Sequence, residues 1–457
     1  MAIVKKSTKA AAVNPLKMSQ PLGASYAFLG MNRCMPVMHG SQGCTSFGLV
    51  LLVRHFREAI PLQTTAMNEV TSILGGIDNI EKAILNIRER TKPDLIAICS
   101  TGLTETKGDD VDGYLAQIRQ RHPELADTAI VYASTPDYSG AFQDGWAKAV
   151  LAMIKALVPS STPFTLFTEK NPKQVNLLAG CHLSPADIEE LRDIVESFGL
   201  SAIVLPDVSG SLDGHIPDGF SPTTIGGTTL AEMRSMGASV ATLVVGEQMR
   251  ACAGELERMT GVPSVMFERL TGLASNDRFL ATLAQLSGMP IPARQRRLRS
   301  QLQDAMLDGH FFFGGKKVAI AAEPDLLYTL AMWLAEMGCE IVIAVTTTAS
   351  PLLERLPLAE VLLGDLEDME QGAQGCDLMI THSHGRQAAA RLQIPFHRAG
   401  LPMFDRLGAG HQLSVGYRGT RGLIFEIGNL FLANPHEVHP QQWQLPVASV
   451  RALEQMA

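Results

Sequence analysis

Short apolar runs alternate with helical stretches along most of the chain, and this alternation restricts the possible folds more than any other feature. The runs over residues 95–100 and 129–134 lack the polar-apolar alternation of a half-exposed strand, so each predicts a buried parallel strand. Similar runs begin at residues 175, 201, 239, 317, 339, 377 and 395. Successive β-α-β units with right-handed crossovers predict an α/β fold of three doubly wound, Rossmann-like domains, with mostly parallel sheets flanked by helices.

Helix signals between these runs place the domain boundaries. Ser184 is a typical N-cap, Pro185 suits the first turn that follows it, and Gly199 ends the same helix. The charged stretch over residues 292–307 predicts a helix that joins the second unit to the third. The length of 457 residues agrees with roughly three domains of about 150 residues each. We expect the domains to span residues 1–165, 166–300 and 301–457, the last including the C-terminal segment.

Composition excludes several classes of protein. Hydrophobic residues make up 46% of the chain and charged residues 18%, so the chain can bury a sizeable core. The net charge of −8, without a dense basic tract, argues against a nucleic-acid partner. The N-terminus has no continuous apolar segment like that of a signal peptide, and the apolar run near Leu49 breaks at Arg54, too short to span a membrane. We therefore expect a soluble, cytoplasmic protein with no membrane partner.

The cysteines do not form a site by themselves. The seven of them are Cys34, Cys44, Cys99, Cys181, Cys252, Cys339 and Cys376. They are scattered, odd in number and contain no C-x-x-C pair, which excludes a disulfide framework and a self-contained zinc site. An iron–sulfur site built by one chain needs about four thiolates, usually with some closely spaced. A metal cluster on this chain must therefore be shared with another chain, or be absent; a metal role for Cys99 or Cys252 is left open.

One cysteine lies where a glycine-rich loop meets a helix. Residues 39–43 read His-Gly-Ser-Gln-Gly, and Cys44 follows directly. Phe47, Val50 and Leu51 then recur at the spacing of a helix with one buried face. Free N–H groups and the dipole at a helix N-terminus stabilise a thiolate, so Cys44 is a candidate ligand. The alternative is that Cys44 is a small buried hydrophobe, as most free cysteines are.

Two further loops rich in Gly, Ser, Thr and Asp follow the strands at residues 95–100 and 129–134. In a doubly wound sheet they lie at the same edge as the Cys44 loop, where such folds bind ligands. Glu105, Asp109 and Asp110 of the first loop have no histidine nearby in the sequence, so we expect them to cap helices rather than transfer protons.

Two other patterns carry less weight. His382 and His384 could share a metal, but a structural or capping role is the stronger expectation because no third ligand lies near them. No G-x-x-x-x-G-K-[ST] motif occurs, so the chain has no P-loop for ATP.

Taken together, several motifs resemble those of one family. They are SQPLGASYAFLGMNRCMPVMHGSQGC, RHFRE, GDD, TPDYSGAFQDGW, IGGTT, SGMPIPA and RAGLPMFDR, and they occur in the family's order between about residues 15 and 429. The chain resembles the β-type chain of the nitrogenase component 1 superfamily. This resemblance implies three α/β domains, pairing with an α-type chain, and iron–sulfur clusters at the interface between the two.

Departures from the family pattern narrow the expectation. The catalytic molybdenum–iron β chain carries three cysteine ligands for an eight-iron cluster, at the positions of Ser19, Cys44 and Gly102 here. Cys99 is three residues out of register with the third position. With one ligand of three, this chain cannot hold its half of an eight-iron cluster in the usual way. The resemblance then implies a [4Fe-4S] cluster with Cys44 as one ligand and three ligands from the partner chain.

The resemblance also implies a role in cofactor assembly rather than catalysis, and no catalytic residue is expected. An α2β2 complex of this kind holds an iron–molybdenum cofactor precursor, mainly on the partner chain, because the middle domain here offers no obvious Cys and His pair. Molybdenum and homocitrate are inserted, and the product passes to apo-nitrogenase. A precursor donor loads the complex, and an ATP-dependent iron protein docks transiently to deliver electrons, which agrees with the missing P-loop.

Two alternatives remain at this point. One is a redox-enzyme β chain of the same superfamily, either the nitrogenase molybdenum–iron β chain or that of a dark-operative protochlorophyllide reductase. The other is a metal-free α/β binding protein that shares only the architecture.

Overall fold

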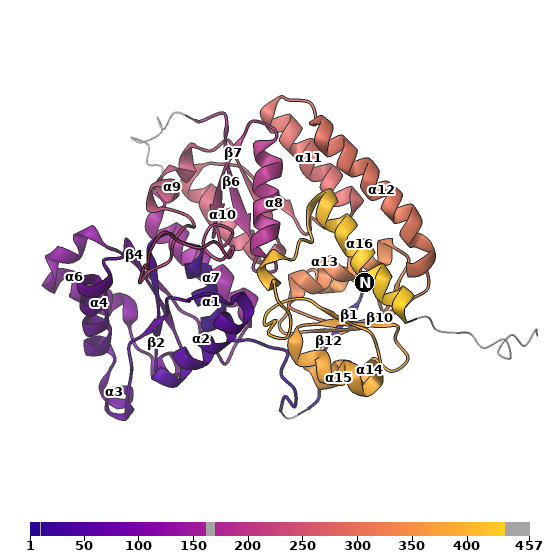
Figure 1. Cartoon of the computed structure of the whole chain (residues 1–457). Helices are drawn as coiled ribbons and strands as arrows, with labels where there is room; N and C mark the ends of the chain where they lie inside the picture. Colours follow the sequence, from indigo (N-terminus) through magenta and orange to yellow (C-terminus); the bar gives the residue numbers. More distant parts are fainter. Residues whose placement is uncertain (10, 161–169, 435–457) are drawn as a thin grey trace, which may run out of the picture.

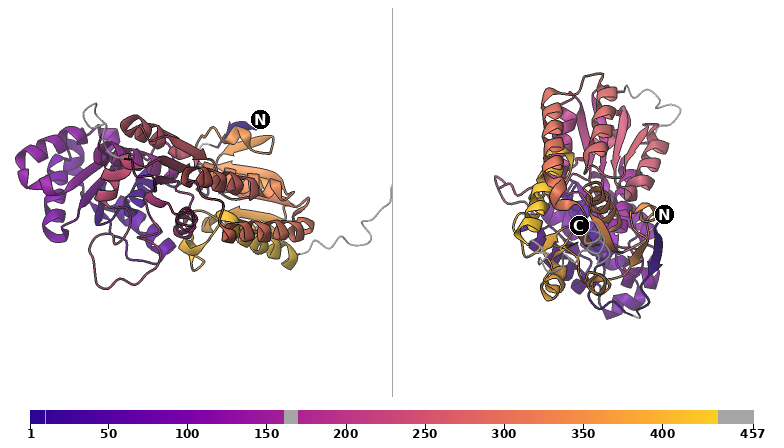
Figure 2. Two further views of the ribbon diagram at one scale, coloured as in Figure 1. Left: turned by 90° about the horizontal axis from the view of Figure 1, so that it is seen from above. Right: turned by 90° about the vertical axis from the view of Figure 1, so that its right-hand side faces the viewer.

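The computed structural model describes residues 1–9, 11–160 and 170–434, and it contains three sheets in which every pairing of strands is parallel (Figure 1). Helices flank the sheets, and the three units lie against one another in an elongated molecule (Figure 2). The predicted α/β class with three doubly wound units is confirmed.

The first sheet has the order β3-β2-β4-β5. Its strands are β2 Cys34–His39, β3 Gln63–Thr64, β4 Leu95–Ser100 and β5 Ala129–Ala133. Its helices are α1 Gln20–Leu29, α2 Gln42–Phe56, α3 Glu69–Leu74, α4 Ile77–Thr91, α5 Gly102–Lys107, α6 Val111–Arg121 and α7 Phe142–Leu157. The strand order reverses between β2 and β4, so the connections that follow these two strands leave a crevice at the carboxyl edge.

The second sheet has the order β7-β6-β8-β9. Its strands are β6 Gln174–Ala179, β7 Ser201–Leu205, β8 Ala241–Val245 and β9 Ser264–Phe267. The helices of this part of the chain are α8 Pro185–Glu196, α9 Leu230–Ser235, α10 Arg250–Thr260 and α11 Leu273–Ser287. As expected, α8 begins after Ser184, whose side chain accepts a hydrogen bond from the Asp187 amide.

The third sheet has the order β1-β12-β11-β10-β13-β14. Its strands are β1 Ile3–Lys6, β10 Lys317–Ala321, β11 Glu340–Thr346, β12 Glu360–Leu363, β13 Leu378–Thr381 and β14 Phe396–Arg398. Its helices are α12 Ala293–Phe313, α13 Pro324–Glu336, α14 Leu366–Gly372, α15 Arg386–Leu392 and α16 Gly416–Ala433.

Three features bear on the predicted domain limits, which stay predictions. Strand β1, from the start of the chain, pairs with β12, so the first residues complete the third sheet. Helix α12 runs without a break through residues 300 and 301. The limit at residues 165–166 lies outside the described residues.

One apolar core extends through all three units. Close packing of α1 on α7 supports it: a Cβ added at Gly23 would lie 1.9 Å from the backbone oxygen of Phe142. The buried Trp146 of α7 donates an indole hydrogen bond of 2.9 Å to the Ala179 backbone oxygen at the end of β6, which joins the first unit to the second. In the part of the chain that the structure covers, no helix combines the length and apolar character needed to cross a bilayer.

Helix α2 departs from the sequence expectation in one respect. Leu51 is buried, but Phe47 and Val50 are 68% and 51% exposed, so the predicted buried face is only partly buried. The apolar stripe of α2 instead points away from the chain's own core.

Candidate metal-cluster site

Cys44 lies in the first turn of α2, whose N-cap is Ser41 in an extended conformation. Its thiol is exposed, and the Ser41 hydroxyl is 3.5 Å from the Cys44 sulfur. Of the other six cysteines, five are buried and Cys181 is half-buried. The expectation that Cys44 adjoins a helix N-terminus is confirmed, and the alternative of a small buried hydrophobe is wrong because the side chain is exposed.

Three loops meet at this edge of the first sheet, as the sequence predicted. The Thr101 hydroxyl donates to the backbone oxygen of His39 at 2.9 Å, which ties the loop after β4 to the loop that leads to Cys44. A Cβ at Gly40 would lie 2.4 Å from the same hydroxyl oxygen, so this close approach requires glycine. The loop after β5 is tied in as well, because Thr135 donates through its amide to the Ser100 hydroxyl and through its own hydroxyl to the Ser100 backbone oxygen.

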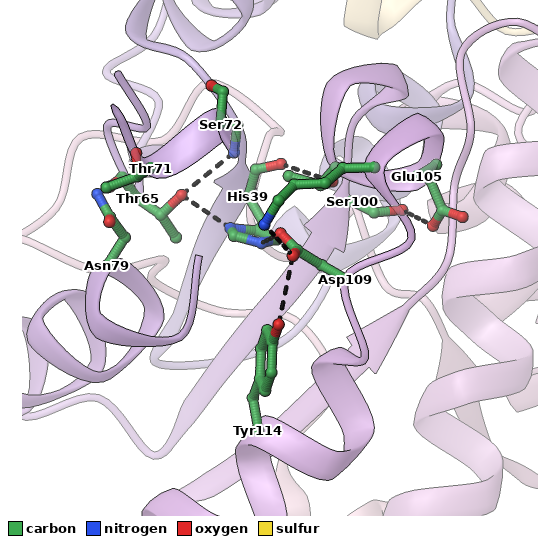
Figure 3. Close-up of polar contacts among 12 residues, drawn as sticks. His39, Thr65, Thr71, Ser72, Asn79, Ser100, Glu105, Asp109 and Tyr114 are labelled. Carbon is green, nitrogen blue, oxygen red and sulfur yellow. Dashed lines mark hydrogen bonds and ion pairs between the residues drawn. The ribbon is translucent and has the colours of Figure 1, made fainter. Parts of the chain in front are cut away.

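A buried polar network lies behind the loop (Figure 3). The His39 Nδ1 is 2.9 Å from the Thr65 hydroxyl, and its Nε2 is 3.4 Å from Asp109 Oδ2. The other oxygen of Asp109 accepts hydrogen bonds from Lys107 Nζ at 2.8 Å and from the Tyr114 hydroxyl at 3.3 Å. Burial lowers the pKa of His39 to about 4, so the imidazole is neutral at physiological pH.

This network corrects one expectation from the sequence. Asp109 does face a histidine, which the sequence concealed because His39 comes from another strand, 70 positions earlier. The other two acids behave as expected. Asp110 caps α6 by accepting from the Gly113 amide at 3.0 Å, and Glu105 accepts from the hydroxyls of Ser100 and Ser134 (Figure 3). These contacts hold the loops together, and they leave no acid in this group aimed at Cys44 as a proton donor.

The donor set at this edge suits a shared cluster and not a complete one. Among residues 1–9, 11–160 and 170–434, no group of three His, Cys, Asp or Glu side chains is arranged to hold a metal ion. The other two family ligand positions carry no thiol: Ser19 is the N-cap of α1, and Gly102 opens α5. Space next to Cys44 is open, because a Cβ at Gly43 would have only the Ser41 hydroxyl within 4 Å, at 3.9 Å.

Cys99 and Cys252 are held in the core. The Cys99 sulfur on β4 lies 3.6 Å from the Ser25 hydroxyl and 3.7 Å from the backbone oxygen of Pro21. Cys252 on α10 donates to the backbone oxygen of Ala147 at 3.2 Å. Burial raises the pKa of each thiol to about 12, which keeps both protonated. Neither is placed to reach a cluster at the Cys44 edge.

Exposed apolar side chains surround the site. We call the set the apolar rim; it comprises Phe47, Val50 and Val53 of α2, Val70, Ile73 and Leu74 of α3, and Leu103 of α5. Helix α3 has no buried residue at all, and it projects from the lower edge of the first unit (Figure 1). Exposed apolar groups gathered around one edge are typical of a protein–protein contact.

Two histidine features lie away from Cys44. The His382 ring accepts from the His384 amide at 3.4 Å and its Nε2 is 3.2 Å from the Leu16 oxygen, so the expected capping role is confirmed. The sequence analysis overlooked the adjacent pair Cys181 and His182 after β6, which line a cavity of about 110 Å³ between the units. Their adjacency in the sequence was the signal that could have indicated them.

Comparison with known proteins now identifies the family. Residues 19–432 match the family described as nitrogenase component 1 type oxidoreductase. The chain belongs to this family. It is 58% identical over 449 residues to the nitrogenase iron-molybdenum cofactor biosynthesis protein NifN of Bradyrhizobium diazoefficiens, covering 97% of this chain and 95% of that protein. The protein of the same name from a Nostoc species is 51% identical, with 94% and 96% covered.

A solved structure supports the same assignment. A chain of "Nitrogenase Cp1 at pH 6.5" superimposes with a TM-score of 0.88 at 32% identity, covering 97% of this chain and 98% of that chain. A chain of "Nitrogenase Cp1 at pH 5" superimposes with a TM-score of 0.70 at 14% identity and shows the shared fold alone.

Proposed function

We propose that this chain is the β-type subunit of a scaffold complex on which the iron–molybdenum cofactor of nitrogenase is matured before transfer to the catalytic protein. The observation that carries the proposal is the ligand pattern: Cys44 is an exposed thiol, whereas Ser19 and Gly102 offer none. A redox-enzyme β chain with the family's eight-iron cluster needs thiolates at all three positions. The names of relatives at 51–58% identity that cover nearly the whole chain support the same assignment.

Cys44 supplies one of four thiolates to a [4Fe-4S] cluster at the subunit interface, and the partner chain supplies the other three. When bound, such a cluster stores and passes on single electrons. The α2 N-terminus favours the negative charge of the thiolate by roughly 0.3–1 kcal/mol, so the iron–sulfur bonds dominate and the helix adjusts the site. The hydrogen bond from Thr101 to His39 and the Gly40 contact fix the loop that presents Cys44.

The partner is an α-type chain of the same family, and two such pairs form an α2β2 complex. The apolar rim supports this arrangement, because a partner that covers it removes Phe47 and Val50 from water and keeps solvent away from the cluster. The precursor is held mainly on the partner chain. A precursor donor, apo-nitrogenase and an ATP-dependent iron protein act on the complex in turn, as molybdenum and homocitrate are inserted.

Loss of this chain from a nitrogen-fixing cell tests the function. We expect the deletion strain to accumulate apo-nitrogenase, whose activity returns when isolated cofactor is added to the extract. A strain producing the Cys44→Ala chain serves as the comparison. An extract that isolated cofactor does not restore would contradict the scaffold role and favour the catalytic β chain.

A further inference from the structure

Gly102 is a buried position at the crevice of the first sheet. It opens α5 directly after Thr101, whose hydroxyl bonds to the loop that leads to Cys44. A Cβ added at Gly102 would lie 1.9 Å from Asp137 Oδ1 and 2.8 Å from Asp137 Cγ. Since real side chains do not approach that closely, the carboxylate of Asp137 occupies the space that any side chain at position 102 needs.

The loop that carries Asp137 is held on both sides. Two residues before it, Thr135 makes hydrogen bonds of 2.7 and 2.8 Å to the hydroxyl and the backbone oxygen of Ser100. Two residues after it, the backbone oxygen of Ser139 accepts from the Gln20 side chain at the start of α1. The backbone of this loop is thereby tied to β4 and α1, and only the two side-chain torsions of Asp137 can move the carboxylate away.

We propose that Asp137 is a specificity-determining residue that restricts this chain to one thiolate at the interface, and so selects a four-iron cluster over an eight-iron cluster. It acts in two ways. Its carboxylate fills the space above Gly102, and its negative charge disfavours a second thiolate beside it. The inference rests on the proposed function, because it concerns which cluster the scaffold interface accepts.

Alkylation of a thiol introduced at position 102 tests the proposal. The complex with the partner chain is prepared with Gly102→Cys alone, with Gly102→Cys plus Asp137→Ala, and with Gly102→Cys plus Asp218→Ala. Asp218 is an exposed aspartate in the loop between β7 and α9 and serves as the matched control. Iron is removed with a chelator, and the rate of iodoacetamide labelling at residue 102 is followed by peptide mass spectrometry.

Removing Asp137 should speed labelling by about tenfold or more, the ratio that a thiol pKa lower by one unit gives, while the Asp218 variant should match Gly102→Cys alone. Equal rates in all three would overturn the proposal. If Gly102→Cys prevents assembly, restored assembly with Asp137→Ala supports the proposal, and continued failure overturns it. Labelling does not depend on iron, so a complex that never held iron would contradict the proposed function without affecting this result.

Discussion

Replacing Cys44 with alanine separates a ligand from a packing residue, because the two roles predict opposite effects on iron and on stability. The thiol is exposed, and its one polar contact in the chain is the Ser41 hydroxyl at 3.5 Å. Substitutions at such surface positions usually change the free energy of unfolding by less than about 0.5 kcal/mol. Alanine also favours a helix slightly more than cysteine does. The fold should therefore be almost unaffected.

Cluster binding should respond in the opposite way. Alanine has no donor atom, so one iron of a four-iron cluster loses its ligand, and water or Ser41 can replace the thiolate only weakly. We expect a lower iron content per complex and loss or replacement of the reduced-state EPR signal. Cys44→Ser should give an intermediate result, since a serine oxygen can bind iron but more weakly than a thiolate does.

Cys252→Ala is the matched control. Cys252 is fully buried and donates to the Ala147 oxygen, so its loss should cost about 1–2 kcal/mol from a small cavity and a missing hydrogen bond, with iron and EPR unchanged. Thermal melting by circular dichroism, iron analysis and EPR on both variants complete the comparison. Wild-type iron content and an unaltered EPR signal in the Cys44→Ala complex would refute the reasoning.

Three further predictions follow from the same structure. The Ser19→Cys/Gly102→Cys variant should not gain an eight-iron cluster, because Asp137 fills the space above Gly102; a Mössbauer spectrum of a complete eight-iron cluster would contradict this. Val50→Glu, which places a charge on the apolar rim, should leave the chain folded but abolish partner binding in size-exclusion chromatography, and undiminished complex formation would argue against the interface. Burial raises the pKa of Glu323 to about 8, so the folded chain binds more protons than the unfolded chain between pH 4.5 and 8 and loses stability as the pH rises through that range; Glu323→Gln should flatten this dependence in pH-dependent thermal melts, and parallel curves would contradict it.

Much of the fold was predictable because buried parallel strands leave a clear pattern. The runs that became β4, β6, β8 and β10 are short, continuous and rich in β-branched or aliphatic residues, so periodicity identified them. Strand β2 was not predicted, because its sequence CMPVMH contains proline and two methionines, which are not typical of strands. Its place in the sheet depends on pairing with β4 along its whole length, a contact that no local pattern records.

The candidate site was predictable in part for the same reason. The glycine loop and the helix that follows Cys44 are local features, and the shared edge of three loops follows from the doubly wound fold. The contact of His39 with Asp109 and that of Gly102 with Asp137 join residues from different strand ends, so they required coordinates. The outward direction of Phe47 also escaped prediction, because a helical stripe that faces a partner chain has the same period as one that faces the core.

The central claim is that this chain contributes a single thiolate to a four-iron cluster shared with its partner. The most direct test is ⁵⁷Fe Mössbauer spectroscopy with iron analysis on the complex, purified without oxygen from cells that lack the precursor donor. The account predicts about four irons per pair of chains, in the spectrum of a [4Fe-4S] cluster, and a loss of that spectrum with Cys44→Ala. About eight irons per pair, or an iron-free complex of full stability, would contradict it.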